Sequence, residues 1–208
     1  SITDYEINIL NQQYKILTCS EFTNDIFNTF GVTKPIQYIP LGFDSDSFYQ
    51  TNKKYLEDKI TFGIMGKLEP CRKQHKKTIQ AWLKKYGNQQ RYVLNCALFN
   101  PFLKPEQQNA LLSDIFGGER WWNVNLCPYM EKNDLFNDYL CSNNIVLAMS
   151  GGESWSLGEF QSVCLGKYCV GLLAHGHKGW MNEENTVCVK PNSKYPANDG
   201  MFFIQGAQ

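Results

Sequence analysis

Short apolar runs alternate with amphipathic segments along most of this 208-residue chain, and this alternation restricts the fold more than any other feature. The runs expected to be strands are 15–19, 36–39, 60–65, 92–97, 123–127, 144–149, 168–172 and 186–189. The segments with apolar residues at helical spacing are 21–30, 76–86, 106–116, 134–141 and 156–165. Because neighbouring parallel strands need long crossover connections, which are usually helices, the alternation predicts a parallel α/β sheet.

The composition is typical of a globular protein and argues against several classes. Twenty basic and twenty acidic residues give a formal net charge of zero, which argues against a general nucleic-acid binder. The eight cysteines show no Cys-x-x-Cys pair and mostly lie in apolar runs, so we expect free buried thiols in a reducing compartment. No apolar run reaches the roughly 18 residues of a transmembrane helix, and the chain does not begin with a secretory signal. We therefore expect a cytoplasmic protein.

The segment 145–167, IVLAMSGGESWSLGEFQSVCLGK, is the most informative about function. It joins a predicted buried strand to a predicted helix through a small polar turn that contains Glu153. Ligands of parallel sheets bind beyond the carboxyl ends of the strands, where the N–H groups of the next helix favour anions such as a diphosphate. A carboxylate is a poor phosphate ligand but a good acceptor for the hydroxyls of an attached sugar. The turn therefore predicts a site for a nucleotide sugar.

This segment resembles the donor-site signature of retaining GT-B glycosyltransferases of the group 1 class. That signature reads Ser-x-x-Glu-Gly-Phe/Trp-Gly/Asn-Leu-Pro and is followed by a second Glu. The matching residues are Ser150, Glu153, Ser154, Trp155, Ser156 and Leu157, with Gly166 at the family's helix-end glycine. Counting back from Gly166, the second Glu falls on Gln161. In the family this carboxylate binds the ribose hydroxyls. A Gln amide can also form hydrogen bonds with these hydroxyls, but it has no negative charge.

Two further stretches match the same family in the correct order. The stretch 60–68, ITFGIMGKL, followed by Arg72 and Lys73, resembles the family's strand, Gly-Arg/Lys-Leu and Lys. The stretch 36–48, IQYIPLGFDSDSF, resembles the hinge segment Val-Ile-Pro-Asn-Gly-Val-Asp-x-x-x-Phe. The resemblance covers residues 16–191 and implies a Rossmann-like parallel sheet with helices on both faces, the C-terminal lobe of a GT-B fold.

The resemblance also implies two domains. Residues 1–42 would be the end of the N-terminal, acceptor-binding lobe and the hinge, and residues 43–208 the donor-binding domain. The polar segment that follows Pro40, with its Pro and Gly residues, agrees with a boundary there. Most of the N-terminal lobe would then be absent from this chain, and we expect the donor domain to be truncated at its C-terminus.

Roles follow residue by residue from the resemblance. Glu153 would orient the donor sugar, while Lys67 and Lys73, or the neighbouring Arg72, would clamp the diphosphate and stabilise charge on the departing nucleotide. Tyr129 and Met130, at the end of another predicted strand, are base-contact candidates. The other substrate-binding candidates are Gly66, Ser154, Ser156, Leu157 and Gln161. The family needs no metal and no cofactor, because the nucleotide diphosphate sugar is itself the donor substrate.

A different interpretation applies to Glu159, His175 and His177. Ser156 and Glu159 have the spacing of a capping box, in which each side chain bonds the other residue's backbone N–H, so we assign Glu159 to structure. His175 and His177 could suggest a metal, but no third ligand is near in sequence except Cys169, so surface or hydrogen-bonding histidines are favoured. The segment 174–181 follows the strand after the Glu153 helix, and we expect it to close over the donor.

These features favour a retaining glycosyltransferase whose donor site this chain supplies. The acceptor, a glycan, lipid or protein, stays open because the family selects it with the N-terminal lobe. One alternative is a GT-B nucleotide-sugar epimerase, for which Glu153 and His175 would be the acid and base candidates. A second is a non-catalytic nucleotide or carbohydrate-binding module, which the absent lobe and Gln161 would allow.

Overall fold

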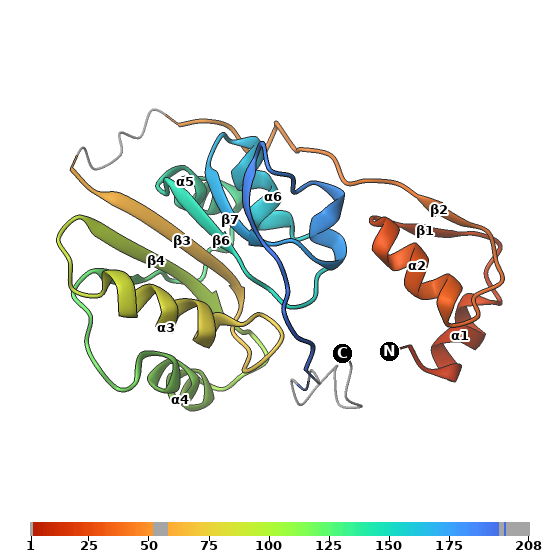
Figure 1. Ribbon diagram of the computed structural model, residues 1–208, viewed down its shortest axis with the longest axis horizontal. Helices are drawn as coiled ribbons and strands as arrows, with labels where there is room; N and C mark the ends of the chain where they lie inside the picture. The colour runs from red at the N-terminus through yellow and green to blue at the C-terminus, as the bar shows by residue number, and fades with distance from the viewer. Residues whose placement is uncertain (1, 52–57, 196–197, 199–208) are drawn as a thin grey trace.

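Six parallel strands form the larger of two sheets in the computed structural model, which describes residues 2–51, 58–195 and 198 (Figure 1). The order of the strands across this sheet is β5-β4-β3-β6-β7-β8. Their bounds are β3 Ile60–Lys67, β4 Tyr92–Phe99, β5 Val124–Leu126, β6 Ile145–Ala148, β7 Tyr168–Leu172 and β8 Thr186–Val189. All six were predicted from the sequence, which confirms the parallel α/β class.

Helices cover both faces of this sheet, as expected for a Rossmann-like lobe. Their bounds are α3 His75–Tyr86, α4 Pro105–Phe116, α5 Asn133–Cys141 and α6 Leu157–Cys164. On one face, Phe62 and Ile64 of β3 pack with Ile79 of α3. On the other face, Met65 of β3 packs with Leu140 of α5. Alternate residues of β3 therefore supply two separate cores, because successive side chains of a strand point to opposite faces.

The N-terminal residues form a second, smaller unit. It contains α1 Asp4–Leu10, β1 Ile16–Thr18, α2 Glu21–Thr29 and β2 Ile36–Tyr38, and β1 pairs with β2 in parallel. Helix α1 was not expected from the sequence, although Thr3 and Glu6 form a complete capping box at its start. The boundary predicted between residues 42 and 43 falls in the connection between β2 and β3, part of which lies outside the described residues.

The strand order creates a switch point between β3 and β6. From β3 the chain moves outward through β4 and β5, and it then returns to β6 on the other side of β3 before moving outward through β7 and β8. At such a point the two flanking connections leave the sheet in opposite directions and open a crevice at the carboxyl ends of the strands. None of the helices in the described part of the chain is long and apolar enough to cross a membrane.

Candidate functional site

The switch point brings together the basic residues after β3 and the acidic turn after β6. Glu153 Oε1 lies 3.0 Å from Arg72 Nη1 and also accepts a hydrogen bond from Lys73 Nζ. Arg72 Nη1 donates a second bond of 2.6 Å to the carbonyl oxygen of Gly152. Two segments about eighty residues apart in sequence are thus joined through their side chains. The expectation that Glu153 and the basic pair lie near one another is met by the structure.

These charges decide the ionisation of Glu153. Burial alone would raise the pKa of its carboxyl, but the opposing effects of Lys73, Arg72 and Ser150 outweigh burial and hold the pKa below its usual value. Glu153 is therefore a carboxylate throughout the neutral range. In this state it can accept hydrogen bonds from hydroxyl groups but cannot donate a proton.

A second carboxylate, Glu69, lies beneath the basic residues and was not identified from the sequence. It is 3% exposed and lies 3.1 Å from Arg72 Nε, and its Oε1 accepts a 3.0 Å hydrogen bond from the Lys73 backbone N–H. Its Oε2 lies 3.7 Å from Lys67 Nζ. Glu69 thus contacts the charged groups of Lys67 and Arg72 and the backbone of Lys73, and its position between Lys67 and Arg72 in sequence was the available signal.

The structure distinguishes Lys73 from Arg72, which the sequence left as alternatives. The Lys73 side chain lies against Gly66, where an added Cβ would stand 3.3 Å from Lys73 Cε, and Gly66 has a φ of 123° that favours glycine. Lys73 lines a cavity beyond the end of β3. The Arg72 side chain points instead toward Glu69 and Gly152, so it stabilises the turn that contains Glu153.

This cavity, called here the β3–α6 cavity, has a volume of about 460 Å³ and lies on the α5 and α6 side of the sheet. Its wall contains five of the predicted site residues, Gly66, Lys67, Lys73, Tyr129 and Met130. The Tyr129 ring packs on Phe99 with centroids 4.7 Å apart. The apolar and aromatic groups and the two ammonium groups in the wall suit a ligand with a ring and an anionic group.

The remaining predicted site residues are not among the residues found to line this cavity. Ser154, Ser156 and Leu157 belong to the turn and first residue of α6, and Leu157 is 52% exposed. Gln161 is 5% exposed, and its Oε1 has no hydrogen-bond partner in the described part of the protein. The α6 residues in the cavity wall are instead Gly158 and Glu159.

The predicted capping box between Ser156 and Glu159 is wrong. Ser156 has φ 72° and ψ 67°, a left-handed conformation, whereas a capping serine is extended. Its side chain makes no capping bond to the helix backbone, and its Oγ donates to Glu159 Oε2 at 2.8 Å. Glu159, 5% exposed, therefore does not complete a helix cap, and it lies in the wall of the cavity.

The two histidines are buried and hydrogen-bonded, so the prediction of hydrogen-bonding side chains is correct and that of surface positions is wrong. They belong to a short 3-10 helix, η1 His175–Gly179, which sequence reasoning treated as a loop. His175 is 8% exposed and His177 is fully buried. Within the described residues, no three His, Cys, Asp or Glu side chains are grouped as metal ligands would be.

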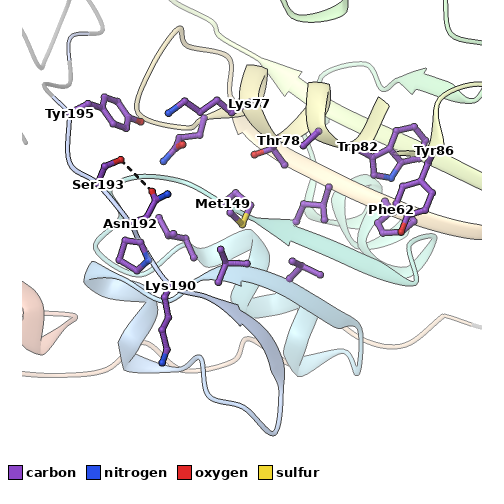
Figure 2. Close-up of a pocket in the computed structure, with 17 residues that line it drawn as sticks. Phe62, Lys77, Thr78, Trp82, Tyr86, Met149, Lys190, Asn192, Ser193 and Tyr195 are labelled. Atoms are coloured by element: carbon purple, nitrogen blue, oxygen red, sulfur yellow. Dashed lines mark hydrogen bonds between the residues drawn. The ribbon is translucent and has the colours of Figure 1, made fainter. Parts of the chain in front are cut away.

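A larger groove of about 660 Å³ lies on the opposite face of the sheet, beside α3 (Figure 2). Trp82 and Tyr86 of α3 line it together with Phe62, and Lys77 and Tyr195 lie at its other end (Figure 2). Among the described residues, this groove has no acidic side chain and neither Lys67 nor Lys73 in its wall. We therefore place the candidate site in the smaller β3–α6 cavity.

Several solved structures share the fold of this chain. HepE from Anabaena in complex with UDP and glucose matches with a TM-score of 0.74 at 14% identity, over 91% of this chain and 54% of HepE. The fold is that of a GT-B glycosyltransferase lobe. Sucrose-phosphate synthase from Thermosynechococcus elongatus matches this GT-B lobe with a TM-score of 0.73 at 15% identity, over 90% of this chain and 48% of the synthase.

A solved C-terminal domain shows which lobe is matched. The C-terminal domain of the group 1 family glycosyl transferase LpcC from Francisella tularensis has a TM-score of 0.59 at 16% identity, over 73% of this chain and 82% of that domain. The GT-B resemblance expected from the motifs is confirmed at the level of fold. No protein-family model and no curated protein matches the sequence. The chain spans about half the length of HepE and of sucrose-phosphate synthase.

Proposed function

We propose that this chain supplies the donor site of a retaining glycosyltransferase that uses a nucleotide diphosphate sugar. The observation that carries the proposal is the ion-paired contact of Glu153 with Lys73, a residue that lines a cavity together with Lys67. The two ammonium groups suit a diphosphate, and the ionised Glu153 suits sugar hydroxyls. One ionised carboxylate and two ammonium groups can therefore serve the two halves of one ligand.

In the proposed reaction the chain acts by position and electrostatics. Lys67, Lys73 and the N–H groups at the start of α6 stabilise the negative charge that develops on the departing diphosphate. Glu153 orients the sugar so that the acceptor attacks on the face that the leaving phosphate vacates, which gives retention. Tyr129 and Met130 contact the base.

The ribose is assigned to Glu159 rather than to Gln161. A carboxylate accepts hydrogen bonds from two adjacent hydroxyls, and Glu159 is the α6 carboxylate in the cavity wall. Gln161 fits this role less well because it is buried away from the residues that line the cavity. Ser156, hydrogen-bonded to Glu159, contributes by holding that carboxylate in place.

Two solved neighbours indicate which donor to test first. HepE has been solved with UDP-glucose, and the trehalose-6-phosphate protein from E. coli, which matches with a TM-score of 0.66 at 12% identity, has been solved with UDP-2-fluoro glucose. A uridine diphosphate sugar is therefore the first candidate. All eight cysteines are free, which agrees with our proposal of a cytoplasmic location in a reducing compartment.

The test is to incubate the chain with UDP-, GDP- and ADP-sugars while NMR follows the sugar and calorimetry measures binding. Slow release of the sugar with its anomeric configuration retained supports a transferase site. Appearance of an epimer would support the epimerase alternative, and binding without turnover the non-catalytic module. Equal affinity for a nucleoside and its diphosphate would overturn the phosphate site itself.

A further inference from the structure

The turn that carries Glu153 is held from behind by η1. His175 Nδ1 accepts a hydrogen bond of 3.2 Å from the backbone N–H of Glu153. Since Nδ1 is the acceptor, the ring proton of the neutral imidazole is on Nε2, which lies 3.1 Å from the carbonyl oxygen of Ser150 and donates to it. One side chain thus bonds both ends of the segment 150–153.

The neighbouring glycine adds a main-chain contact to the same residue. The Gly176 N–H donates to the carbonyl oxygen of Glu153 at 2.9 Å. A Cβ on Gly176 would stand 2.0 Å from the carbonyl oxygen of Ser154, so this close approach requires glycine. Both main-chain polar groups of Glu153 are therefore bound by residues 175 and 176.

The helix η1 is itself fixed to the sheet. His177, which is fully buried, lies with Nδ1 2.8 Å from the carbonyl oxygen of Leu172 at the end of β7. Trp180 Nε1 donates to the carbonyl oxygen of Trp155 at 2.6 Å. His175 has a φ of 39°, a left-handed conformation that a histidine keeps only where its surroundings determine it.

We propose that His175 is a positioning residue that keeps the Glu153 carboxylate at the Lys73 end of the β3–α6 cavity. Without its acceptor nitrogen the Glu153 N–H is left without a bond, and the segment 150–153 loses one of the contacts that fix its direction. The Glu153 carboxylate would then sample other positions while the lysines stay in place. This inference rests on the proposed function, because the role concerns recognition of the donor sugar.

Three substitutions separate the two ring nitrogens. His175→Asn keeps an acceptor oxygen at the distance of Nδ1 along the side chain, and Asn tolerates a left-handed backbone. His175→Gln keeps a donor at the distance of Nε2 but has no acceptor at the distance of Nδ1, and His175→Ala removes both groups. Lys178→Ala, at an exposed position of the same η1, is the matched control.

The first measurement is amide hydrogen exchange at Glu153 by NMR on the ligand-free chain. We expect exchange to rise about tenfold in the Gln and Ala variants, the ratio for one lost bond, and to stay near the wild-type rate in the Asn variant and the control. Unchanged protection of the Glu153 amide in His175→Gln would overturn the inference.

The second measurement compares affinities for UDP-glucose and UDP by calorimetry. We expect the ratio of the two affinities to fall about tenfold in His175→Gln and His175→Ala, with UDP affinity unchanged and the ratio restored in His175→Asn. An equal loss for both ligands would show a merely structural role and overturn the inference. Absence of any sugar-dependent affinity in the wild type, for UDP-glucose and for the GDP- and ADP-sugars, would refute the proposed function and the positioning role with it.

Discussion

The hydroxyl of Ser156 donates a hydrogen bond of 2.8 Å to Glu159 Oε2, which is the reverse of the relationship that a capping box requires. In a capping box the serine oxygen accepts a backbone N–H and the carboxylate turns back toward the helix start. Here the carboxylate is held by Ser156, and Glu159 lines the β3–α6 cavity together with the lysines that we assign to the diphosphate. The contact therefore changes Glu159 from a structural residue into a candidate for ligand binding.

Replacement of Glu159 by Gln tests this assignment. We expect Glu159→Gln to weaken binding of UDP and of uridine alike by about 1.5–3 kcal/mol, the range for hydrogen bonds to charged groups, because the ribose is common to both. Calorimetry on the two ligands measures the effect. Gln161→Ala is the matched control and should leave both affinities within a factor of about three. The opposite pattern would return the ribose contact to Gln161.

Replacement of Lys73 by Ala tests the phosphate end of the cavity. We expect Lys73→Ala to weaken UDP binding by about 1.5–3 kcal/mol and to leave uridine binding unchanged, because only UDP carries the charge that Lys73 contacts. Lys76→Ala is the control, since Lys76 is an exposed residue of α3 that pairs with Asp114 at 2.6 Å. A loss of uridine affinity in Lys73→Ala would show that the substitution distorts the cavity.

Removal of divalent metal tests the prediction that the site needs none. The family resemblance implies that charge on the diphosphate is balanced by Lys67 and Lys73 rather than by an ion. We therefore expect EDTA to leave the affinity for UDP-glucose unchanged in calorimetry at constant ionic strength. A requirement for manganese or magnesium, restored by adding the metal back after EDTA, would contradict the GT-B mechanism proposed for this chain.

The sheet could be predicted from the sequence because the burial of strands and helices determines the spacing of apolar residues along the chain. The bounds predicted for β7 and β8 agree with the structure residue for residue, and the other strands of the large sheet agree to within about two residues. The same reasoning predicted that Glu153 and Lys73 lie at one edge of the sheet, because the carboxyl ends of adjacent parallel strands meet there. What the sequence predicted was therefore the position of backbone segments.

The directions of individual side chains could not be predicted in the same way. Ser156, whose backbone is left-handed, holds the Glu159 carboxylate by a hydrogen bond, and no periodicity encodes a single φ angle. Glu69 and His175 act through contacts with residues that are close to them only in the folded chain, apart from the proximity of Glu69 to Arg72. Helix α1 was missed because its capping box precedes a helix of only seven residues.

Buried neutral histidines should make the protein less stable in mild acid. Burial lowers the pKa of His75 and of His175 to about 4, with Lys73 and Arg72 acting in the same direction on His75 and His177 on His175. Between pH 6.5 and about 4 the unfolded chain binds more protons than the folded chain, so stability is lost as the pH falls through this window. At pH 5 the loss is roughly 2 kcal/mol for each histidine.

His175→Asn should therefore reduce this dependence. We expect the free energy of unfolding in urea to fall less between pH 7 and pH 5 in the variant than in the wild type, by roughly 2 kcal/mol. Because both proteins contain the same carboxylates, the comparison cancels the contributions of those groups. Identical pH dependence in the two proteins would show that His175 is protonated to the same extent in the folded and unfolded chains.

Replacement of Glu153 by Gln tests the group on which the proposed mechanism depends. Glu153 pairs with Lys73 and Arg72, and the side chain of Glu153 is only 13% exposed, so the neutral amide leaves two cations with less compensation. Arg72 keeps its contacts with Glu69 and Gly152, which limits the cost to about 1–2 kcal/mol of stability. Urea unfolding measures this loss of stability.

Glu153→Gln should affect the binding of UDP and the binding of UDP-glucose differently. In Glu153→Gln we expect UDP to bind at least as tightly as to the wild type, because Lys73 no longer shares its charge with a carboxylate. UDP-glucose should lose its added affinity over UDP, because the neutral amide accepts hydrogen bonds from the sugar more weakly than a carboxylate does. Calorimetry with both ligands separates these effects. A parallel loss for UDP and UDP-glucose would mean that Glu153 only supports the lysines, and the sugar contact would have to be sought elsewhere in the turn.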